Sequence, residues 1–463
     1  MFAVQNHRDD FHKLKQKIDN FIQGKYFIFF CALIAIVFHT MSWTTFGIAF
    51  FMGLITFCFS TQKEQLPVFV VLHLVFFVVS KKFIDSHDYT VFIVVFCTML
   101  VLLVASSVYY FTKVHSRPFL KSKLLIPTLV FAVSMFLAGA FTQYYFNKVN
   151  FGLMANLAII YVLMVLFAYN LTTRLSLDCI AKIILVMGLV AAVELLIYFL
   201  LNLGEVDNIF KNKLIALGWG VHNPVGIMIV SSIPAAFYFA NKHKGAILVF
   251  FLAVAFVLYC LQFLTLSRNS MMVGTLIFGA MYLLIFFKAD IKTKKTILIV
   301  CSFILLCIVV MCFIFKEQFF AVLDWIAKMG FNDSERFDWY SLAWKVFLQN
   351  PIFGVGWAYD KASYINAQDF FAVHNTFLQF LVSTGVVGSL TALWMFLKRH
   401  LMLYKNFHYE RLFFIAIIAV FVVTGLIDLS MNNPMFIVIL CSIFACIEWE
   451  NRALSGQASS LIL

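Results

Sequence analysis

The sequence predicts an all-α protein that crosses a membrane about fourteen times, with both termini in the cytoplasm. The chain is 63% hydrophobic with a mean hydropathy of +0.95. Only 12% of its residues are charged, against about 25% in ordinary globular domains. A soluble core cannot hide so much apolar surface, so lipid must solvate much of it. The charges sit in short clusters between apolar runs, so the net charge of +12 indicates membrane topology and not nucleic-acid binding.

We expect one membrane span for each apolar run of roughly 20 residues, or fewer where charged side chains at its ends extend to the membrane interface. The first run follows a polar, basic segment without a cleavage pattern, so we expect it to stay as an anchor. The second and third runs are short, and a count of twelve or thirteen also fits the sequence. The predicted spans lie near residues 26–41, 44–59, 66–79, 90–111, 124–142, 151–171, 179–201, 223–240, 246–264, 270–287, 296–315, 374–397, 412–427 and 433–448.

The distribution of lysine and arginine orients these spans. With the N-terminus inside, 22 of them fall on cytoplasmic segments and 11 on outside segments, which favours this orientation. The predicted organisation is a cytoplasmic segment, eleven membrane helices, one long extracytoplasmic loop, three membrane helices and a cytoplasmic tail. The corresponding boundaries are 1–25, 26–315, 316–373, 374–448 and 449–463.

The loop 316–373 is the only long connection, and a connection of this length is usually functional. Its apolar residues recur at helical spacing in two stretches, which predicts two amphipathic helices on the membrane surface. Asp333 or Ser334 is expected to cap the second helix, and Asn350-Pro351 to end it.

Three outside segments carry residues suited to chemistry: Arg268 in Leu-Ser-Arg-Asn, Arg336 in Glu-Arg-Phe-Asp-Trp, and His374 in Val-His-Asn-Thr. Arginine offers a planar, permanently charged fork that matches phosphate oxygens. Arg336 is expected in the first turn of a helix, where free backbone N–H groups favour anions. His374 is expected at a helix start, where the dipole disfavours imidazolium by ~0.3–1 kcal/mol and keeps the ring able to accept a proton.

Each feature also has a structural interpretation. An arginine at the end of a span is often a snorkelling anchor, a lone histidine is often a hydrogen-bonding group, and a charged first turn is often a solvated helix start. The acidic residues Asp333, Glu335 and Asp338 are interpreted as a capping and charge-balancing set, so no metal site is predicted.

The stretch ERFDWYSLAWKVFLQNPIFGVGWAYD, followed by AVHNTFLQFLVSTGVVG, resembles the signature region of the O-antigen ligase and polymerase superfamily. That signature is an Arg–aromatic helix, an Asn-Pro-x-x-Gly-x-Gly turn, His-Asn-x-x-Leu and a Gly-x-x-Gly helix. The order and spacing match over about fifty residues. Upstream, Ser267-Arg268 and the stretch HNPVGIMIVSSIPAAFYF at 222–239 resemble two further family motifs, whereas the first 200 residues match only in hydropathy.

The resemblance implies a GT-C-like helical bundle that transfers a glycan from undecaprenyl diphosphate. It implies that Arg268 and Arg336 grip the diphosphate and that His374 is the base on the acceptor hydroxyl. A diphosphate held by cations leaves readily without a general acid, so a charge clamp and one base suffice, with no metal or cofactor. Direct displacement would invert the anomeric centre.

Five other residues are candidates for binding the diphosphate or the glycan. Lys211 and Lys213 lie outside before the eighth span, and His222 begins that span much as His374 begins the twelfth, which makes it the competitor for the base. The remaining two are Asn375, next to His374, and Tyr340, on the second surface helix.

The expected location is the bacterial cytoplasmic membrane, with the active site on the periplasmic face. The acceptor is a lipid A-core sugar if the protein is a ligase, or another lipid-linked repeat if it is a polymerase, and the sequence does not separate the two. Membrane lipids and other polysaccharide-assembly proteins are further expected partners. Two alternatives are a transporter or flippase, with Glu194 and Asp428 as a proton relay, and a protein-glycosylating oligosaccharyltransferase.

Overall fold

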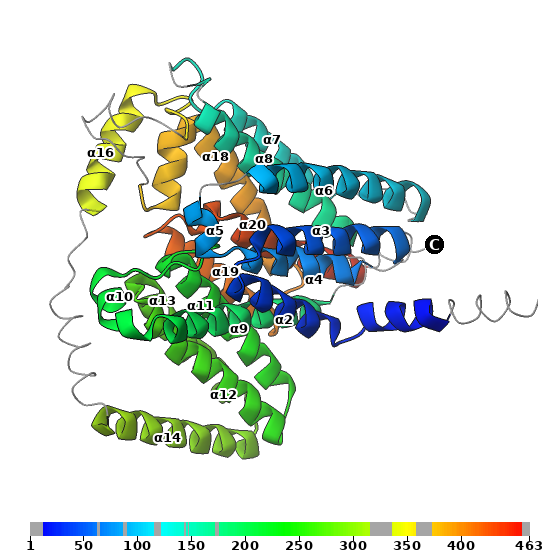
Figure 1. Ribbon diagram of the computed structural model, residues 1–463. Helices are drawn as coiled ribbons and strands as arrows, with labels where there is room; N and C mark the ends of the chain where they lie inside the picture. Colours follow the sequence, from blue (N-terminus) through cyan, green and yellow to red (C-terminus); the bar gives the residue numbers. More distant parts are fainter. Residues whose placement is uncertain are drawn as a thin grey trace, which may run out of the picture.

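A computed structural model describes residues 13–62, 65–86, 90–114, 122–142, 145–146, 148–171, 176–314, 336–357 and 373–455. Within these residues the regular structure is helical, apart from one isolated bridge between Ala216 and Val221. The long helices form a bundle. Two further helices, α10 (Val206–Asn212) and α16 (Arg336–Gln349), lie on its left side in Figure 1, and the short helix α5 (Lys81–Ser86) lies nearer the middle of the view.

Each predicted span coincides with a helix of the structure. Eight of the described helices are long and apolar enough to cross a membrane, and the pair Lys13–Ile22 and Phe27–Thr40, bent by 78°, makes a ninth if it is one span. The helices at the predicted spans are α2 (Phe27–Thr40), α3 (Thr44–Thr61), α4 with η1 (Leu66–Leu74, Val75–Val78), α6 (Thr90–Tyr109), α7 (Leu125–Phe136), α8 (Lys148–Leu171), α9 (Leu177–Leu201), α11 (His222–Lys242), α12 with η4 (Gly245–Leu261, Gln262–Thr265), α13 (Arg268–Lys288), α14 (Ile291–Ile314), α18 (Thr376–Tyr404), α19 (Arg411–Gly425) and α20 (Pro434–Leu454). The predicted class, an all-α polytopic membrane protein, is confirmed.

Several of these helices are shorter than a full span, and α7 shows why. Its apolar run continues to residue 142, but the helix ends at Phe136 because Gly139 adopts a left-handed conformation (φ 76°). The Gly139 N–H donates to the Phe353 carbonyl at 2.9 Å, which ties this turn to the segment after α16. A hydropathy window detects the apolar run but not the tertiary contact that breaks the helix.

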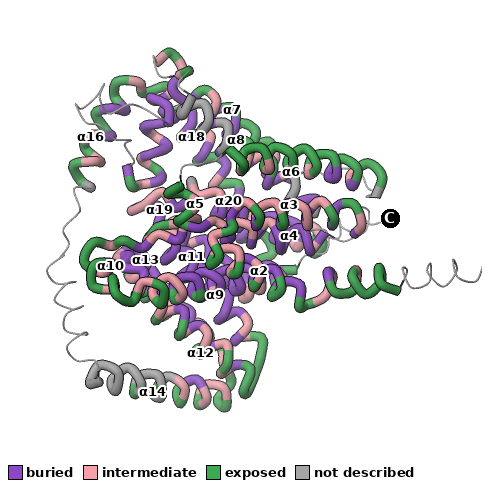
Figure 2. The backbone as a smooth tube through the Cα atoms, viewed as in Figure 1, coloured by how far each residue is buried: buried purple, intermediate pink, exposed green. Residues whose placement is uncertain are grey.

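Burial separates the helices that face lipid from those that face protein (Figure 2). The span of α6 has the highest mean hydropathy, 2.8, and is 11% buried, whereas that of α11 has 1.4 and is 83% buried. Small polar residues on α11 allow close packing, and a Cβ at Gly188 of α9 would overlap the Ser232 side chain. Membrane helices pack on small residues in this way because lipid already solvates the large apolar ones.

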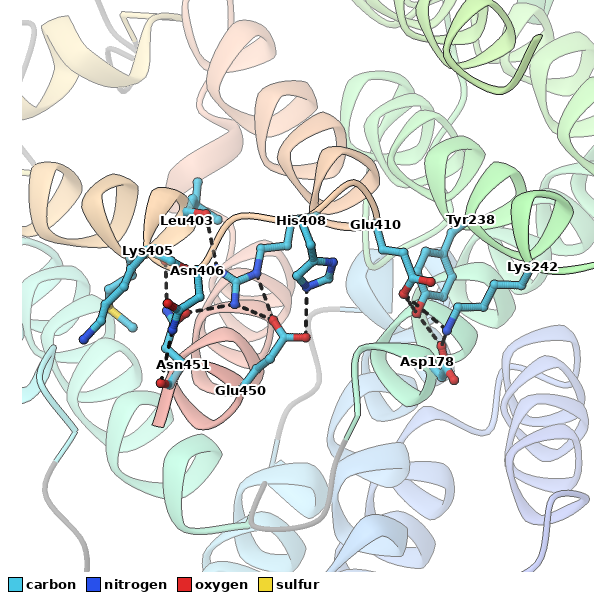
Figure 3. Close-up of polar contacts among 12 residues, drawn as sticks. Asp178, Tyr238, Lys242, Leu403, Lys405, Asn406, His408, Glu410, Glu450 and Asn451 are labelled. Carbon is cyan, nitrogen blue, oxygen red and sulfur yellow. Dashed lines mark hydrogen bonds and ion pairs between the residues drawn. The ribbon is translucent and has the colours of Figure 1, made fainter. Parts of the chain in front are cut away.

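Ion pairs fix helix ends on the side that the charge bias assigns to the cytoplasm (Figure 3). Lys242 at the end of α11 pairs with Asp178 of α9 and with Glu410, 3.4 Å away, just before α19. The fully buried Arg411 binds Glu450 of α20 through its Nε at 2.8 Å. Each pair joins a residue of one helix to a residue on, or directly before, another helix. These contacts therefore set the relative positions of α9, α11, α19 and α20.

Part of the predicted surface loop lies outside the described residues, including the first amphipathic helix, Asp333, Ser334 and Glu335. A helix is present at the second predicted position, α16, and it ends at Gln349 as Asn350-Pro351 predicts.

Candidate active site

A cavity of about 350 Å³ opens among the segments that were predicted to lie outside. It brings together the segment before α11, the turn before α13, the start of α16, the start of α18 and the turn after α19. These segments are far apart in the sequence and meet only through the fold. The lining residues are Lys213, Val221, His222, Asn223, Pro224, Leu266, Arg268, Asn269, Trp339, His374 and Asp428.

His374 lies in a turn just before α18 and not in its first turn, which corrects the predicted helix start. The helix begins at Thr376, and Asn375 is its N-cap, with Oδ1 accepting from the N–H groups of Phe377 and Leu378 at 3.0 Å. His374 itself has a left-handed backbone (φ 51°), and its side chain is 47% exposed. The turn therefore directs the imidazole into the cavity without the full effect of the helix dipole.

Asp428 is the acidic partner of this histidine. Its Oδ1 lies 3.6 Å from His374 Nδ1, slightly beyond hydrogen-bond length, and accepts from the Leu429 N–H at 2.8 Å. Burial raises the pKa of Asp428, but the interactions with His374, the Leu429 N–H and Asn223 outweigh it and hold the pKa below its ordinary value. Asp428 is therefore ionised at neutral pH, and its charge favours a proton on Nδ1 and a free Nε2.

The polar side chains after His374 hold the turn against the segment that carries Asp428. Asn375 Nδ2 donates to the Leu426 carbonyl at 2.9 Å, and Thr376 Oγ1 donates to the Asp428 carbonyl at 2.8 Å. Asn375 thus caps and anchors the helix and is not among the residues that line the cavity. The His-Asn-Thr sequence sets the distance between His374 and Asp428.

Arg268 is the first residue of α13 and is half-buried in the cavity wall. Leu266, in a left-handed conformation, turns the chain into Ser267, the N-cap, whose Oγ accepts from the Ser270 N–H. The same Oγ donates to Asn223 Oδ1 at 2.7 Å. Because Asn223 follows His222 in α11, this bond fixes Arg268 relative to His222.

Residues 213–222 form a small hairpin that contributes to the cavity. Ala216 and Val221 make an antiparallel bridge, and the His222 N–H donates to the Ile215 carbonyl at 3.1 Å. Lys213 and His222 at its two ends both line the cavity, whereas Lys211 is exposed on α10 and does not.

The start of α16 packs against the His374 turn. Trp339 lines the cavity, and Tyr340 Oη donates to the His374 carbonyl at 3.3 Å, so Tyr340 supports the turn through its backbone. Arg336 is the first residue of α16, but its side chain lies outside the described atoms. Asp338, on the same turn, is exposed.

The glycines of the signature stretch allow close contact between two backbone segments, residues 351–356 and residues 382–387 of α18. Gly385 breaks α18 with φ 66° and ψ −165°, and the Val386 N–H donates to the Pro351 carbonyl at 2.8 Å. On the other side, the Val355 N–H donates to the Val382 carbonyl at 2.9 Å. A Cβ on Gly354 or Gly385 would overlap the facing backbone, so both positions require glycine. This contact fixes α16 on α18 and so brings Trp339 to His374.

Residues 248–393 match the family model described as O-antigen ligase. The match includes Arg268, Arg336 and His374 and confirms the resemblance to the O-antigen ligase and polymerase superfamily. Lys213, His222 and Asp428 lie outside the matched stretch. No curated protein and no solved structure matches the chain.

Proposed function

We propose, from the O-antigen ligase domain in residues 248–393, that this chain is a bacterial membrane glycosyltransferase. It transfers a glycan from undecaprenyl diphosphate to a sugar hydroxyl, on the outer face of the cytoplasmic membrane, during surface polysaccharide assembly. One observation carries the proposal: Arg268, Lys213 and the His374–Asp428 pair line one cavity at the end of the bundle that the charge bias assigns to the outside.

In this mechanism the cationic side chains bind the diphosphate of the donor. Arg268 binds it as a fork, Lys213 adds charge, and Arg336 supplies a second fork beside the free N–H groups at the start of α16. As the bond between the anomeric carbon and the phosphate oxygen breaks, its electron pair passes to the diphosphate. The cations stabilise this charge as it develops, so the leaving group needs no proton.

His374 removes the acceptor proton in the same displacement. Its Nε2 takes the proton while the hydroxyl oxygen forms a bond to the anomeric carbon from the face opposite the diphosphate. Attack from that face inverts the configuration. Asp428 stabilises the resulting imidazolium and keeps the ring in the tautomer that presents Nε2.

His222 lines the same cavity and remains the alternative base. The contact with Asp428 favours His374, because a carboxylate beside Nδ1 orients the imidazole and stabilises the imidazolium that forms when it accepts a proton. The transporter alternative needs Glu194 and Asp428 to act together. Glu194 instead lines a different cavity and accepts a hydrogen bond from Trp219, which does not favour a relay between the two acids.

The direct test uses purified protein in nanodiscs with a lipid-linked glycan donor and two acceptors supplied separately, a lipid A-core and a second lipid-linked repeat. We expect transfer to one of them in the presence of a metal chelator, with inversion of the anomeric configuration. Transfer to neither acceptor, together with donor crossing the bilayer, would support a transporter. In a deletion strain, single repeats on the core indicate a polymerase, and unattached lipid-linked chains indicate a ligase.

The outer location is tested by cysteine labelling in a cysteine-free background. Asp207 on α10 and Lys292 on α14 are both exposed and lie at opposite predicted sides. A membrane-impermeant thiol reagent should label Asp207→Cys and not Lys292→Cys in intact cells. The reverse pattern would put the cavity on the cytoplasmic face.

A further inference from the structure

A second cavity, of about 460 Å³, opens beside the first. It is lined by the end of α2, the start of α5, the end of α9 and the hairpin 213–222, all predicted to lie outside. Ten of the fourteen residues that line it have polar or charged side chains, although it reaches between membrane helices. Its volume is within the usual range for small-ligand sites, about 300–1,000 Å³. None of its residues has a role in the mechanism above.

The hairpin 213–222 is a shared wall between the two cavities. Ala216 and Leu217 line the second cavity, while Lys213, Val221 and His222 line the first. Ala216 and Val221 are directly opposite each other in the bridge of the hairpin, so one residue of this pair borders each cavity. A ligand in the second cavity is therefore close to a ligand in the first.

The wall is anchored at its tip. Gly218 has a φ of 93° and packs so closely on the backbone of Ser80 that a Cβ would overlap it. Trp219 packs on Phe77, with ring centroids 4.9 Å apart, and its Nε1 donates to Glu194 Oε2 at 2.7 Å. These contacts hold the hairpin in place, so the second cavity is a formed feature of the fold.

Glu194 supplies an unused acceptor at this cavity. Its side chain is fully buried, and its Oε1 has no hydrogen-bond partner among the described residues. A second nitrogen near this carboxyl, His39 Nδ1, lies 3.8 Å from Oε2 and does not bond to it, because it donates to the Val79 carbonyl at 3.1 Å. A buried carboxyl oxygen without a donor is costly, and it lies where a ligand hydroxyl can satisfy it.

The chemistry of the remaining lining matches a sugar. Ser42 offers a hydroxyl, and Asn202 donates through Nδ2 to the Tyr198 carbonyl at 2.7 Å and keeps its amide oxygen for a ligand. Lys81, Lys82 and Asp85 are exposed and offer both charged donors and a carboxylate acceptor. Hydroxyl groups both donate and accept, so a polyhydroxyl ligand can use this mixture of groups where an apolar ligand cannot.

We propose that the second cavity is a glycan-binding site, in which Glu194 accepts a sugar hydroxyl and the hairpin 213–222 separates the bound sugars from the transfer site. This rests on the proposed function. The site holds sugars next to the one that reacts. The glycan belongs either to the acceptor or to the donor, and both present the same hydroxyl-rich chemistry.

The test measures binding, which needs no turnover. Two lipid-free probes are used with protein in nanodiscs: the core oligosaccharide of the host lipopolysaccharide, and the repeat released by mild acid from the host undecaprenyl-linked pool. Their dissociation constants are measured for wild type, Glu194→Gln, Ala216→Trp and Leu214→Trp. Ala216→Trp fills the cavity, whereas Leu214 is exposed on the same hairpin and lines neither cavity.

We expect Ala216→Trp to abolish binding of one probe and Leu214→Trp to leave it unchanged. Glu194→Gln keeps an acceptor for Trp219 but loses the unpartnered carboxyl oxygen, and should weaken binding roughly fivefold, as for loss of one hydrogen bond of about 1 kcal/mol. Binding of the core probe assigns the site to the acceptor, and binding of the repeat assigns it to the donor.

Two results would overturn the proposal: no binding of either probe to wild type, or equal binding by wild type and Glu194→Gln. Glu194→Gln decides the outcome if Ala216→Trp fails to fold, which its melting temperature reports. His374→Ala should bind the probe normally and fail in transfer. Normal transfer by His374→Ala would contradict the proposed mechanism and leave the binding result intact.

Discussion

Replacing Asp428 by asparagine removes one negative charge beside His374 and preserves the shape of the side chain. The asparagine Oδ1 can still accept from the Leu429 N–H, so the turn after α19 should persist. At an effective dielectric constant of about 20, unit charges separated by 3.6 Å attract each other by about 4–5 kcal/mol. His374 is 47% exposed, and water screens roughly half of this energy, which leaves about 2 kcal/mol.

This energy acts on the imidazolium that forms as the acceptor is deprotonated. We therefore expect kcat to fall roughly 30-fold in Asp428→Asn, with the donor KM unchanged because the arginines bind the diphosphate. The low pKa of Asp428 keeps it ionised throughout the neutral range, so the defect should not disappear between mildly acidic and mildly alkaline pH. Asp207→Asn, on the exposed face of α10, is the matched control.

The assay is steady-state transfer by purified protein at saturating donor and acceptor, repeated in a His374→Ala background. Because Asp428 acts through His374, its substitution should cost little further activity once the histidine is gone. A kcat within twofold of wild type would refute the role of the carboxylate. An equal loss in both backgrounds would show that Asp428 acts independently of His374.

Three further outcomes follow from the site and its support. Arg268→Lys keeps the charge but loses the fork, so the donor KM should rise and transfer should fall at least tenfold; near wild-type kinetics would reduce Arg268 to a background charge. Gly385→Ala forces a Cβ into the Ile352 carbonyl in a glycine-only conformation and should destabilise the fold by about 3 kcal/mol or more, seen as a lower melting temperature. Gly279→Ala, with open space around its Cβ position, should not lower it. Trp219→Phe removes the donor to Glu194 and should lower the melting temperature.

Local signals in the sequence predicted the helices well and their ends less well. The position of α16 followed from its apolar spacing and from Asn350-Pro351, both of which are local. The start of α18 was placed two residues early, because an apolar run does not distinguish His374 in a turn from Thr376 in the helix. The early end of α7 depends on a contact between Gly139 and Phe353, far apart in the sequence.

The sequence predicted the residues of the candidate site that lie in recognisable motifs, but not the residue that pairs with His374. The motif that contains His374 and the Ser-Arg at 267–268 identified two lining residues, and the position of Lys213 and His222 before the eighth span identified two more. Asp428 was considered only as part of a proton relay, although it is the only carboxylate between the last two spans. Its pairing with His374 arises from the hydrogen bonds of Asn375 and Thr376 to residues 426–428, which no local pattern reveals.

The central claim is that His374 is the base of a glycan transfer, and its most direct test compares two histidines that line one cavity. His374→Ala and His222→Ala are purified in nanodiscs with lipid-linked donor and acceptor, and single-turnover transfer and donor binding are measured for each. Loss of a general base typically costs about 10²–10⁴-fold in rate, so His374→Ala should bind donor normally and transfer slowly, while His222→Ala keeps most of its rate. Normal transfer by His374→Ala would contradict the claim, and it would assign the base to His222 if His222→Ala were inactive.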